Sequence, residues 1–162
     1  MKKTVLAICF SSLALTGCAT LETAKTNWTD PRASVIAGVK VKLESCSRTE
    51  NEVQCFLTLT SMGQDRKAQL DGNASKTSIL IDNKGNQYSP TYNRVGNSVR
   101  SDGYTVRHNL VADVTTEVEQ RFSNIHSQAT KISRLSVDIY VSGKNVKSGN
   151  GTATFRNVEL SP

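Results

Sequence analysis

Two histidines and a pair of glutamates are the side chains of this sequence that could do acid–base chemistry. His108 falls on the apolar side of an alternating run, where a hydrogen-bonded core histidine is expected, and His126 lies in a polar connection. Glu117 and Glu119 stand two residues apart on the polar side of a predicted strand, beside Arg121. Their spacing would suit a shared site, but a solvated sheet face is the simpler interpretation. We therefore predict no catalytic residue.

Other chemical motifs are missing from the sequence. It has no Gly-x-Ser-x-Gly elbow, no His-Glu-x-x-His metal motif and no Walker loop. Residues 82–86, Asp-Asn-Lys-Gly-Asn, lack the alternating ligands and closing glutamate of an EF-hand, so they predict a turn rather than a calcium site. The formal net charge is +6, but basic residues are spread along the chain and not clustered with aromatic residues, which argues against nucleic-acid binding. We expect a protein that is not an enzyme and that uses neither a metal nor another cofactor.

The first seventeen residues have the pattern of an export signal. Lys2 and Lys3 precede an apolar run, residues 4–15, which is shorter than the roughly 20 residues that a membrane-spanning helix needs. A basic start, a short apolar run and small residues at the end are typical of a secretory signal peptide. We predict that residues 1–17 are removed.

The end of this segment, Leu15-Thr16-Gly17-Cys18, resembles the lipobox of bacterial lipoproteins. The resemblance implies cleavage after Gly17 and attachment of lipid, including palmitate, to Cys18. Ala19 follows, not the aspartate that commonly retains such proteins at the inner membrane, so the resemblance favours an outer-membrane lipoprotein facing the periplasm or the cell surface. At about 0.8 kcal/mol per buried methylene, several acyl chains would hold the protein firmly on a membrane.

Two cysteines remain once Cys9 leaves with the signal and Cys18 carries lipid. Cys46 and Cys55 lie in alternating runs joined by a polar segment, which predicts a β-hairpin. In an oxidising compartment such a pair forms a structural disulfide. A redox pair or a metal site is the alternative, but the sequence has no Cys-x-x-Cys motif and no histidine near the pair.

The mature chain divides into a tether and one domain. Residues 18–34 are polar, contain Pro31 and predict a flexible connection after the lipidated cysteine. Residues 35–162 alternate between apolar and polar side chains almost throughout; Val118, Gln120 and Phe122, for example, oppose Glu117, Glu119 and Arg121. Seven or eight strands with no convincing amphipathic helix predict an all-β fold, an antiparallel β-sandwich. Residues 86–103 and 142–151 are expected to be polar contact loops.

Three segments carry a resemblance to a fold family. They are residues 53–61 (VQCFLTLTS), 80–88 (LIDNKGNQY) and 154–158 (TFRNV). Their order is similar to that of the immunoglobulin-like sandwiches of unknown function that occur in bacterial lipoproteins and secreted proteins. The resemblance implies the fold and supplies no catalytic residue.

These observations favour a lipid-anchored binding or scaffolding module that contacts another cell-envelope protein. A glycan or small-ligand binder is the alternative, with Tyr88, Tyr92 and Tyr104 as its candidate binding residues, although tyrosines that cap the core would give the same pattern. An accessory lipoprotein of a secretion machine is a third hypothesis. The expected partners are a membrane, through Cys18, and an envelope protein, with no nucleic acid.

Overall fold

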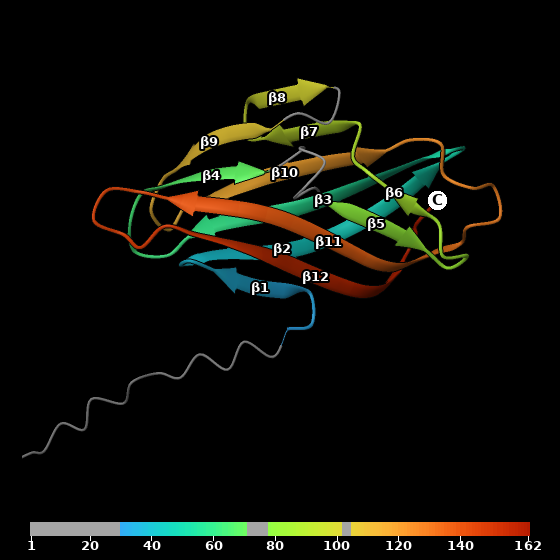
Figure 1. The fold of residues 1–162 in the computed structure, drawn as a ribbon, viewed down its shortest axis with the longest axis horizontal. Helices are drawn as coiled ribbons and strands as arrows, with labels where there is room; N and C mark the ends of the chain where they lie inside the picture. The colour runs from blue at the N-terminus through green and yellow to red at the C-terminus, as the bar shows by residue number, and fades with distance from the viewer. Residues whose placement is uncertain (1–29, 71–77, 102–104) are drawn as a thin grey trace, which may run out of the picture.

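The computed structural model describes residues 30–70, 78–101 and 105–162. Within these ranges the chain forms twelve strands and no helix, and the strands build two antiparallel sheets (Figure 1). The predicted fold class, an all-β antiparallel sandwich, is confirmed. No helix in the described part of the chain is long and apolar enough to cross a membrane.

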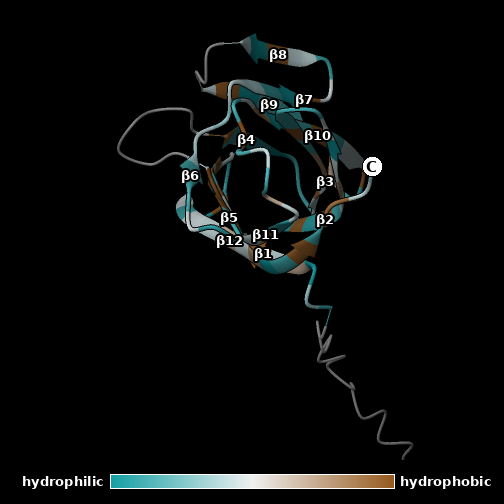
Figure 2. Cartoon of the chain, turned by 90° about the vertical axis from the view of Figure 1, so that its right-hand side faces the viewer, coloured by the Kyte–Doolittle hydropathy of each residue, from teal (hydrophilic) through white to brown (hydrophobic). Residues whose placement is uncertain are grey.

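The first sheet, sheet A, contains six strands. Their spatial order is β1 (Ala33–Ile36), β2 (Val39–Thr49), β3 (Glu52–Ser61), β10 (Thr115–Phe122), β7 (Tyr92–Val95) and β8 (Ser98–Ser101). Among the strands that the structure describes, β8 pairs with β7 alone, and it lies at the rim of the molecule in both views (Figures 1 and 2). Sheet A therefore joins the beginning of the domain to its middle through the non-local pairing of β3 with β10.

The second sheet, sheet B, is organised around one long strand, β11 (Lys131–Ser142). Strand β12 (Gly149–Glu159) covers one edge of β11 along almost its whole length. On the other edge, β5 (Ile79–Asp82) pairs with the first half of β11 and β4 (Arg66–Leu70) with the second half. Strand β6 (Gln87–Tyr88) adds to β5, and β9 (Val106–Leu110) adds to β4. Two short strands thus share one edge end to end.

The core fills the space between the two sheets, as the alternation of the sequence requires. One face of each sheet is apolar and packs against the other sheet, and the opposite face is polar. The largest buried side chains include Leu43, Leu57, Leu59 and Phe122 from sheet A, and Leu70, Leu80, Leu135, Ile139 and Phe155 from sheet B.

One polar pair interrupts this core. Gln120 takes the inward position that the alternation of β10 predicts, and its Nε2 donates a hydrogen bond of 2.8 Å to Oδ1 of Asn93 on β7. Both side chains are fully buried. Because a buried amide must find a partner, this bond favours the register in which β7 and β10 lie side by side.

The predicted disulfide is confirmed. Cys46 on β2 and Cys55 on β3 lie directly opposite each other in the register of the hairpin and are bonded. Both cysteines are buried, so the bridge belongs to the core and closes a loop across nine positions of sequence.

The strand count was wrong: the described residues hold twelve strands, not seven or eight. The expected loop at residues 86–103 instead contains β6, β7 and β8, which are short, largely polar strands with little apolar alternation to reveal them. The segment 142–151 is a loop only between β11 and β12, at residues 143–148. Strand β1 also takes in Ala33 and Ser34, which the sequence analysis placed in the tether.

Candidate functional site

The outer face of sheet A carries an array of polar and aromatic side chains on three adjacent strands. In the register of β3, β10 and β7, Arg121 lies between Gln54 and Tyr92. One step along the strands, Glu119 lies between Phe56 and Arg94. Neighbouring strands lie about 4.8 Å apart, so charged side chains at these positions can reach one another directly.

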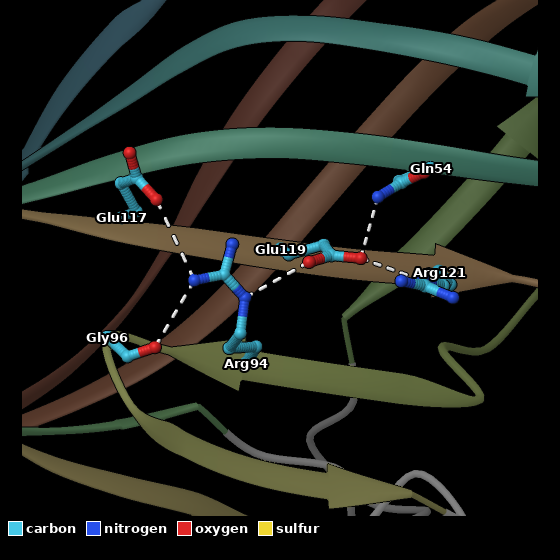
Figure 3. Close-up of polar contacts among 6 residues, drawn as sticks. All are labelled: Gln54, Arg94, Gly96, Glu117, Glu119 and Arg121. Carbon is cyan, nitrogen blue, oxygen red and sulfur yellow. Dashed lines mark hydrogen bonds and ion pairs between the residues drawn. The ribbon is translucent and has the colours of Figure 1, made fainter.

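Glu119 is the centre of this array (Figure 3). Its Oε1 accepts hydrogen bonds of 2.6 Å from Nε2 of Gln54 and 2.6 Å from Nε of Arg121. Its Oε2 accepts a hydrogen bond of 3.0 Å from Nε of Arg94. Arg94 also donates through Nη1 to the carbonyl oxygen of Gly96 and lies 3.7 Å from a carboxylate oxygen of Glu117. We call Glu119, Arg94, Arg121 and Gln54 the Glu119 cluster.

The expected solvated sheet face is wrong for Glu119. This residue is only 5% exposed, although it points away from the core, because the side chains around it cover it. The side chain of Glu117, two residues earlier, is 76% exposed and fits the expectation. Sequence alternation predicts which way a side chain points but not what covers it, and Arg94 comes from a segment that was expected to be a loop.

The charge of Glu119 is fixed by its neighbours. Burial raises the pKa of a carboxyl group, but here the hydrogen bonds and charges of Arg121 and Arg94 outweigh burial and hold the pKa of Glu119 below its ordinary value. Glu119 raises the pKa of Arg121 in return. The carboxylate is therefore ionised at neutral pH and is a poor proton donor, so its function here is to hold two guanidinium groups in place.

Two aromatic rings flank the cluster. The guanidinium carbon of Arg121 lies 4.7 Å from the centroid of the Tyr92 ring, a cation–π geometry. Phe56 on β3 lies beside Glu119, on the other side of it from Arg94, and is half-buried on the same outer face. Arginine and aromatic side chains are the types enriched at the centres of protein–protein interfaces. The array has the composition of a recognition surface rather than of a catalytic centre.

Of the three tyrosines predicted to bind a ligand, the two that the structure describes, Tyr88 and Tyr92, lie on different sheets. Tyr88, on sheet B, packs against the core and donates a hydrogen bond of 2.8 Å to Oδ2 of Asp82. Tyr92 lies on the outer face of sheet A, beside Arg121. Tyr104 lies outside the described residues.

The turn predicted at residues 82–86 is confirmed. Asp82 is buried, and its Oδ1 accepts hydrogen bonds from the backbone N–H groups of Lys84 and Asn86. Burial opposes ionisation of Asp82, but hydrogen bonds from Asn86 and Tyr88 hold its pKa below the ordinary value. In the described residues, no group of three or more histidine, cysteine, aspartate or glutamate side chains is placed to hold a metal ion.

The two histidines have structural surroundings. His108 faces the interior near the edge of sheet B, and its Nδ1 lies 3.1 Å from Oγ of Ser98. The backbone N–H of His126 donates to the hydroxyl oxygen of Tyr88, and its Nδ1 accepts a hydrogen bond from the N–H of Gln128. Cys18, the predicted site of lipid attachment, lies outside the described residues.

Comparisons with known proteins show resemblance at the level of the fold only. No family model matches the chain, and a search of curated proteins found no match. Among solved structures, the chain is similar to self-complemented MyfA, the major subunit of Myf fimbriae from Yersinia enterocolitica, in complex with galactose. The two sequences are 9% identical, the match covers 76% of this chain and 98% of the MyfA chain, and the TM-score is 0.45. The chain is also similar to a DUF4426 family protein from Pseudomonas aeruginosa (10% identity, 80% and 98% coverage, TM-score 0.41) and to PapD-like domain 7 of human CEP192 (11%, 93% and 100%, TM-score 0.39).

Proposed function

We propose that this protein is a lipid-anchored, non-catalytic module that binds another protein of the cell envelope through the outer face of sheet A. The observation that carries the proposal is the Glu119 cluster, with Arg94 and Arg121 held on either side of a buried carboxylate. Tyr92 and Phe56 complete the contact surface.

Preorganisation is the physical reason why this cluster suits binding. An arginine that is free to move loses side-chain entropy when a partner immobilises it, and this costs about 0.5–1.5 kcal/mol of binding free energy per side chain. Here Glu119 holds both guanidinium groups through Nε, and Tyr92 supports that of Arg121. Among the described residues nothing accepts a hydrogen bond from the two terminal nitrogens of Arg121, which suits recognition of carboxylate or backbone carbonyl oxygens of a partner.

The anchor is the second part of the proposal and depends on the lipobox at residues 15–18. A lipid on Cys18 would place the sandwich at the outer membrane, on its periplasmic face or at the cell surface. There the domain meets partners that are confined to the same envelope, so even a modest affinity would keep a complex together. An accessory function in a secretion machine is one way in which such a complex would be used.

Site-specific photocrosslinking in intact cells tests the binding face. A photoreactive residue replaces Val99, which is exposed and lies opposite Arg94 in the β7–β8 register; in a second strain it replaces Thr154, which is exposed on β12 of sheet B. We expect the Val99 position to give a discrete adduct with a different protein and the Thr154 position to give none.

A pair of charge variants makes the test specific. Arg121→Gln in the Val99 strain is expected to reduce the adduct about tenfold, whereas Lys84→Gln, an exposed cation in the turn of residues 82–86, leaves the yield unchanged. Recovery of monomer alone, or equal adducts from both faces, would contradict the proposal.

A further inference from the structure

A groove crosses the outer face of sheet B, on the opposite side of the sandwich from the Glu119 cluster. The volume of its main part is about 570 Å³, and that of the adjoining hollow along β8 is about 400 Å³; both lie within the range of about 300–1,000 Å³ typical of small-molecule sites. Two cross-strand rows form its floor. Tyr140, Gln69 and Arg107 make one row across β11, β4 and β9, and Ser142, Lys67 and Asn109 make the next.

The wall of the groove comes from the other sheet. Asn97 and Ser98, at the turn between β7 and β8, border the same space, and Ser98 is tied to His108 of β9 at 3.1 Å. A narrower hollow continues along β8 and is lined by Arg100. The rim strand β8 therefore turns a sheet surface into a groove with one raised side.

The groove is positively charged. Lys67, Arg100 and Arg107 line it, and no aspartate or glutamate of the described chain does so. Within the described residues, none of these three cations lies within 4.0 Å of a carboxylate oxygen, whereas Arg94 and Arg121 on sheet A are both paired. Unpaired cations around a concave surface attract an anionic ligand.

The uncharged side chains of the groove narrow the class of ligand. Nε of Arg107 donates a hydrogen bond of 2.8 Å to Oε1 of Gln69, which orients the guanidinium, and no side chain of the described residues accepts a hydrogen bond from its two terminal nitrogens. Tyr140 presents a half-buried ring beside Gln69. Amide and hydroxyl groups can exchange hydrogen bonds with the hydroxyl groups of a sugar, and an aromatic ring can pack on the apolar face of a sugar ring.

We propose that this groove binds an acidic saccharide, in which Lys67 and Arg107 contact the carboxylate and Tyr140 packs on the sugar ring. A flat membrane surface would need exposed cations alone and would make no use of a hollow lined by amide and aromatic side chains. No residue of the Glu119 cluster lines this groove, although both border β8, so Arg107→Gln and Arg121→Gln test the two proposals separately.

Titration calorimetry on the predicted mature chain, residues 18–162 with Cys18→Ala, tests the proposal, because this chain lacks both the apolar signal and the lipid site. The probes are a galacturonic acid tetramer and its uncharged counterpart, a galactose tetramer. We expect the acidic tetramer to bind at least tenfold more tightly than the neutral one, with an affinity that falls as salt rises. Absence of binding, or equal binding of both tetramers, would overturn the proposal.

Matched variants place the ligand in the groove. We expect Arg107→Gln and Lys67→Gln each to weaken the binding of the acidic tetramer about tenfold, and Tyr140→Leu to weaken it severalfold. Arg156→Gln removes the same charge from β12, on the same face but outside the groove, and should change nothing. An equal loss for Arg156→Gln would show a general charge effect and overturn the site.

Co-sedimentation with phosphatidylglycerol vesicles examines the competing membrane surface. We expect the chain carrying Cys18→Ala to bind these vesicles to the same extent with and without the further substitution Arg107→Gln. Vesicle binding that depends on Arg107, together with no binding of the acidic tetramer, would show that the groove binds a lipid surface and would overturn the saccharide proposal. Thermal unfolding followed by circular dichroism verifies that each variant is folded.

Discussion

At the scale of single residues, Glu119 shows how a surface position becomes a buried charge. It faces outward on β10, yet two arginines and a glutamine satisfy both of its carboxylate oxygens. Removing a charge costs most where its partners stay behind unpaired. The free energy of unfolding should therefore depend strongly on Glu119 and little on Glu117, its exposed neighbour.

The variant Glu119→Gln is expected to lower the free energy of unfolding by about 2 kcal/mol, because Arg94 and Arg121 lose their shared anion. The control Glu117→Gln should stay within about 0.5 kcal/mol of the wild type, since its side chain is largely exposed. Urea unfolding followed by circular dichroism measures both. Equal effects of the two substitutions would mean that the cluster contributes no more than an ordinary surface charge.

Two buried carboxylates, Glu119 and Asp82, contribute to the pH dependence of stability, beside the exposed Glu44, whose pKa the hydrogen bond from Lys42 also lowers. The folded state lowers the pKa of Glu119 and of Asp82, so each binds its proton less readily than in the unfolded chain. The stabilisation that each carboxylate provides is complete above its pKa in the unfolded chain, about 4.3 for glutamate and 3.9 for aspartate. It is lost as the pH falls through the lower pKa of the same group in the folded state. We expect the urea concentration at the midpoint of unfolding to decrease as the pH falls below about 4.5.

The double variant Glu119→Gln/Asp82→Asn should flatten this acid limb, because neither side chain then takes up a proton on unfolding. The same urea series between pH 7 and pH 3 measures the slope. An acid limb as steep as that of the wild type would assign the pH dependence to other groups.

At the scale of strands and turns, the sequence predicts local features well and long-range pairings poorly. The alternation of β10 correctly places Gln120 inside and Glu119 outside, and the hairpin around Cys46 and Cys55 follows from its two alternating runs. Arg94 could not be assigned to the cluster, because β7 has four residues and reaches β10 only through the folded topology. Local periodicity carries no information about which strands become neighbours.

The β7–β8 turn depends on Gly96. Its φ is +55°, and an added Cβ would lie 2.7 Å from the His108 ring. Gly85 also has a positive φ, +86°, but has nothing within 4 Å of that position. Gly85→Ala should therefore cost about 1 kcal/mol for the backbone alone.

We expect Gly96→Ala to cost clearly more than Gly85→Ala, by about 1 kcal/mol, because the His108 ring must also move. Urea unfolding of the two variants measures this difference. If both glycines give the same loss, the contact between this turn and β9 is not tight.

The disulfide offers a second test at this scale. The variant Cys46→Ala/Cys55→Ala opens a small loop and should lower the free energy of unfolding by about 2.5 kcal/mol. Wild-type protein unfolded in urea with a thiol reductant should approach the stability of the variant, and a reductant should not affect the variant itself. A midpoint that the substitutions leave unchanged would show that the strand pairing alone determines the stability of the hairpin.

At the scale of the whole molecule, the two outer faces differ in how their charges are used. On sheet A, the arginines of the Glu119 cluster are paired with glutamates, and Lys42 is paired with Glu44 at 2.8 Å. On sheet B, the cations of the groove have no carboxylate partner in the described part of the chain. A domain with two such faces can bind a protein on one side and an anionic ligand on the other, which suits a module that links components of an envelope.

Such a link needs a fixed attachment, and this is what Cys18 would provide. We expect cells grown with labelled palmitate to label the wild-type protein and the variant Cys9→Ala, and to leave Cys18→Ala unlabelled. At about 0.8 kcal/mol per buried methylene, the acyl chains would supply most of the membrane affinity of the mature chain, since the domain itself buries most of its apolar side chains between two sheets. Label that persists in Cys18→Ala, or a wild-type protein without label, would contradict the anchor while leaving both binding faces to be tested on the soluble chain.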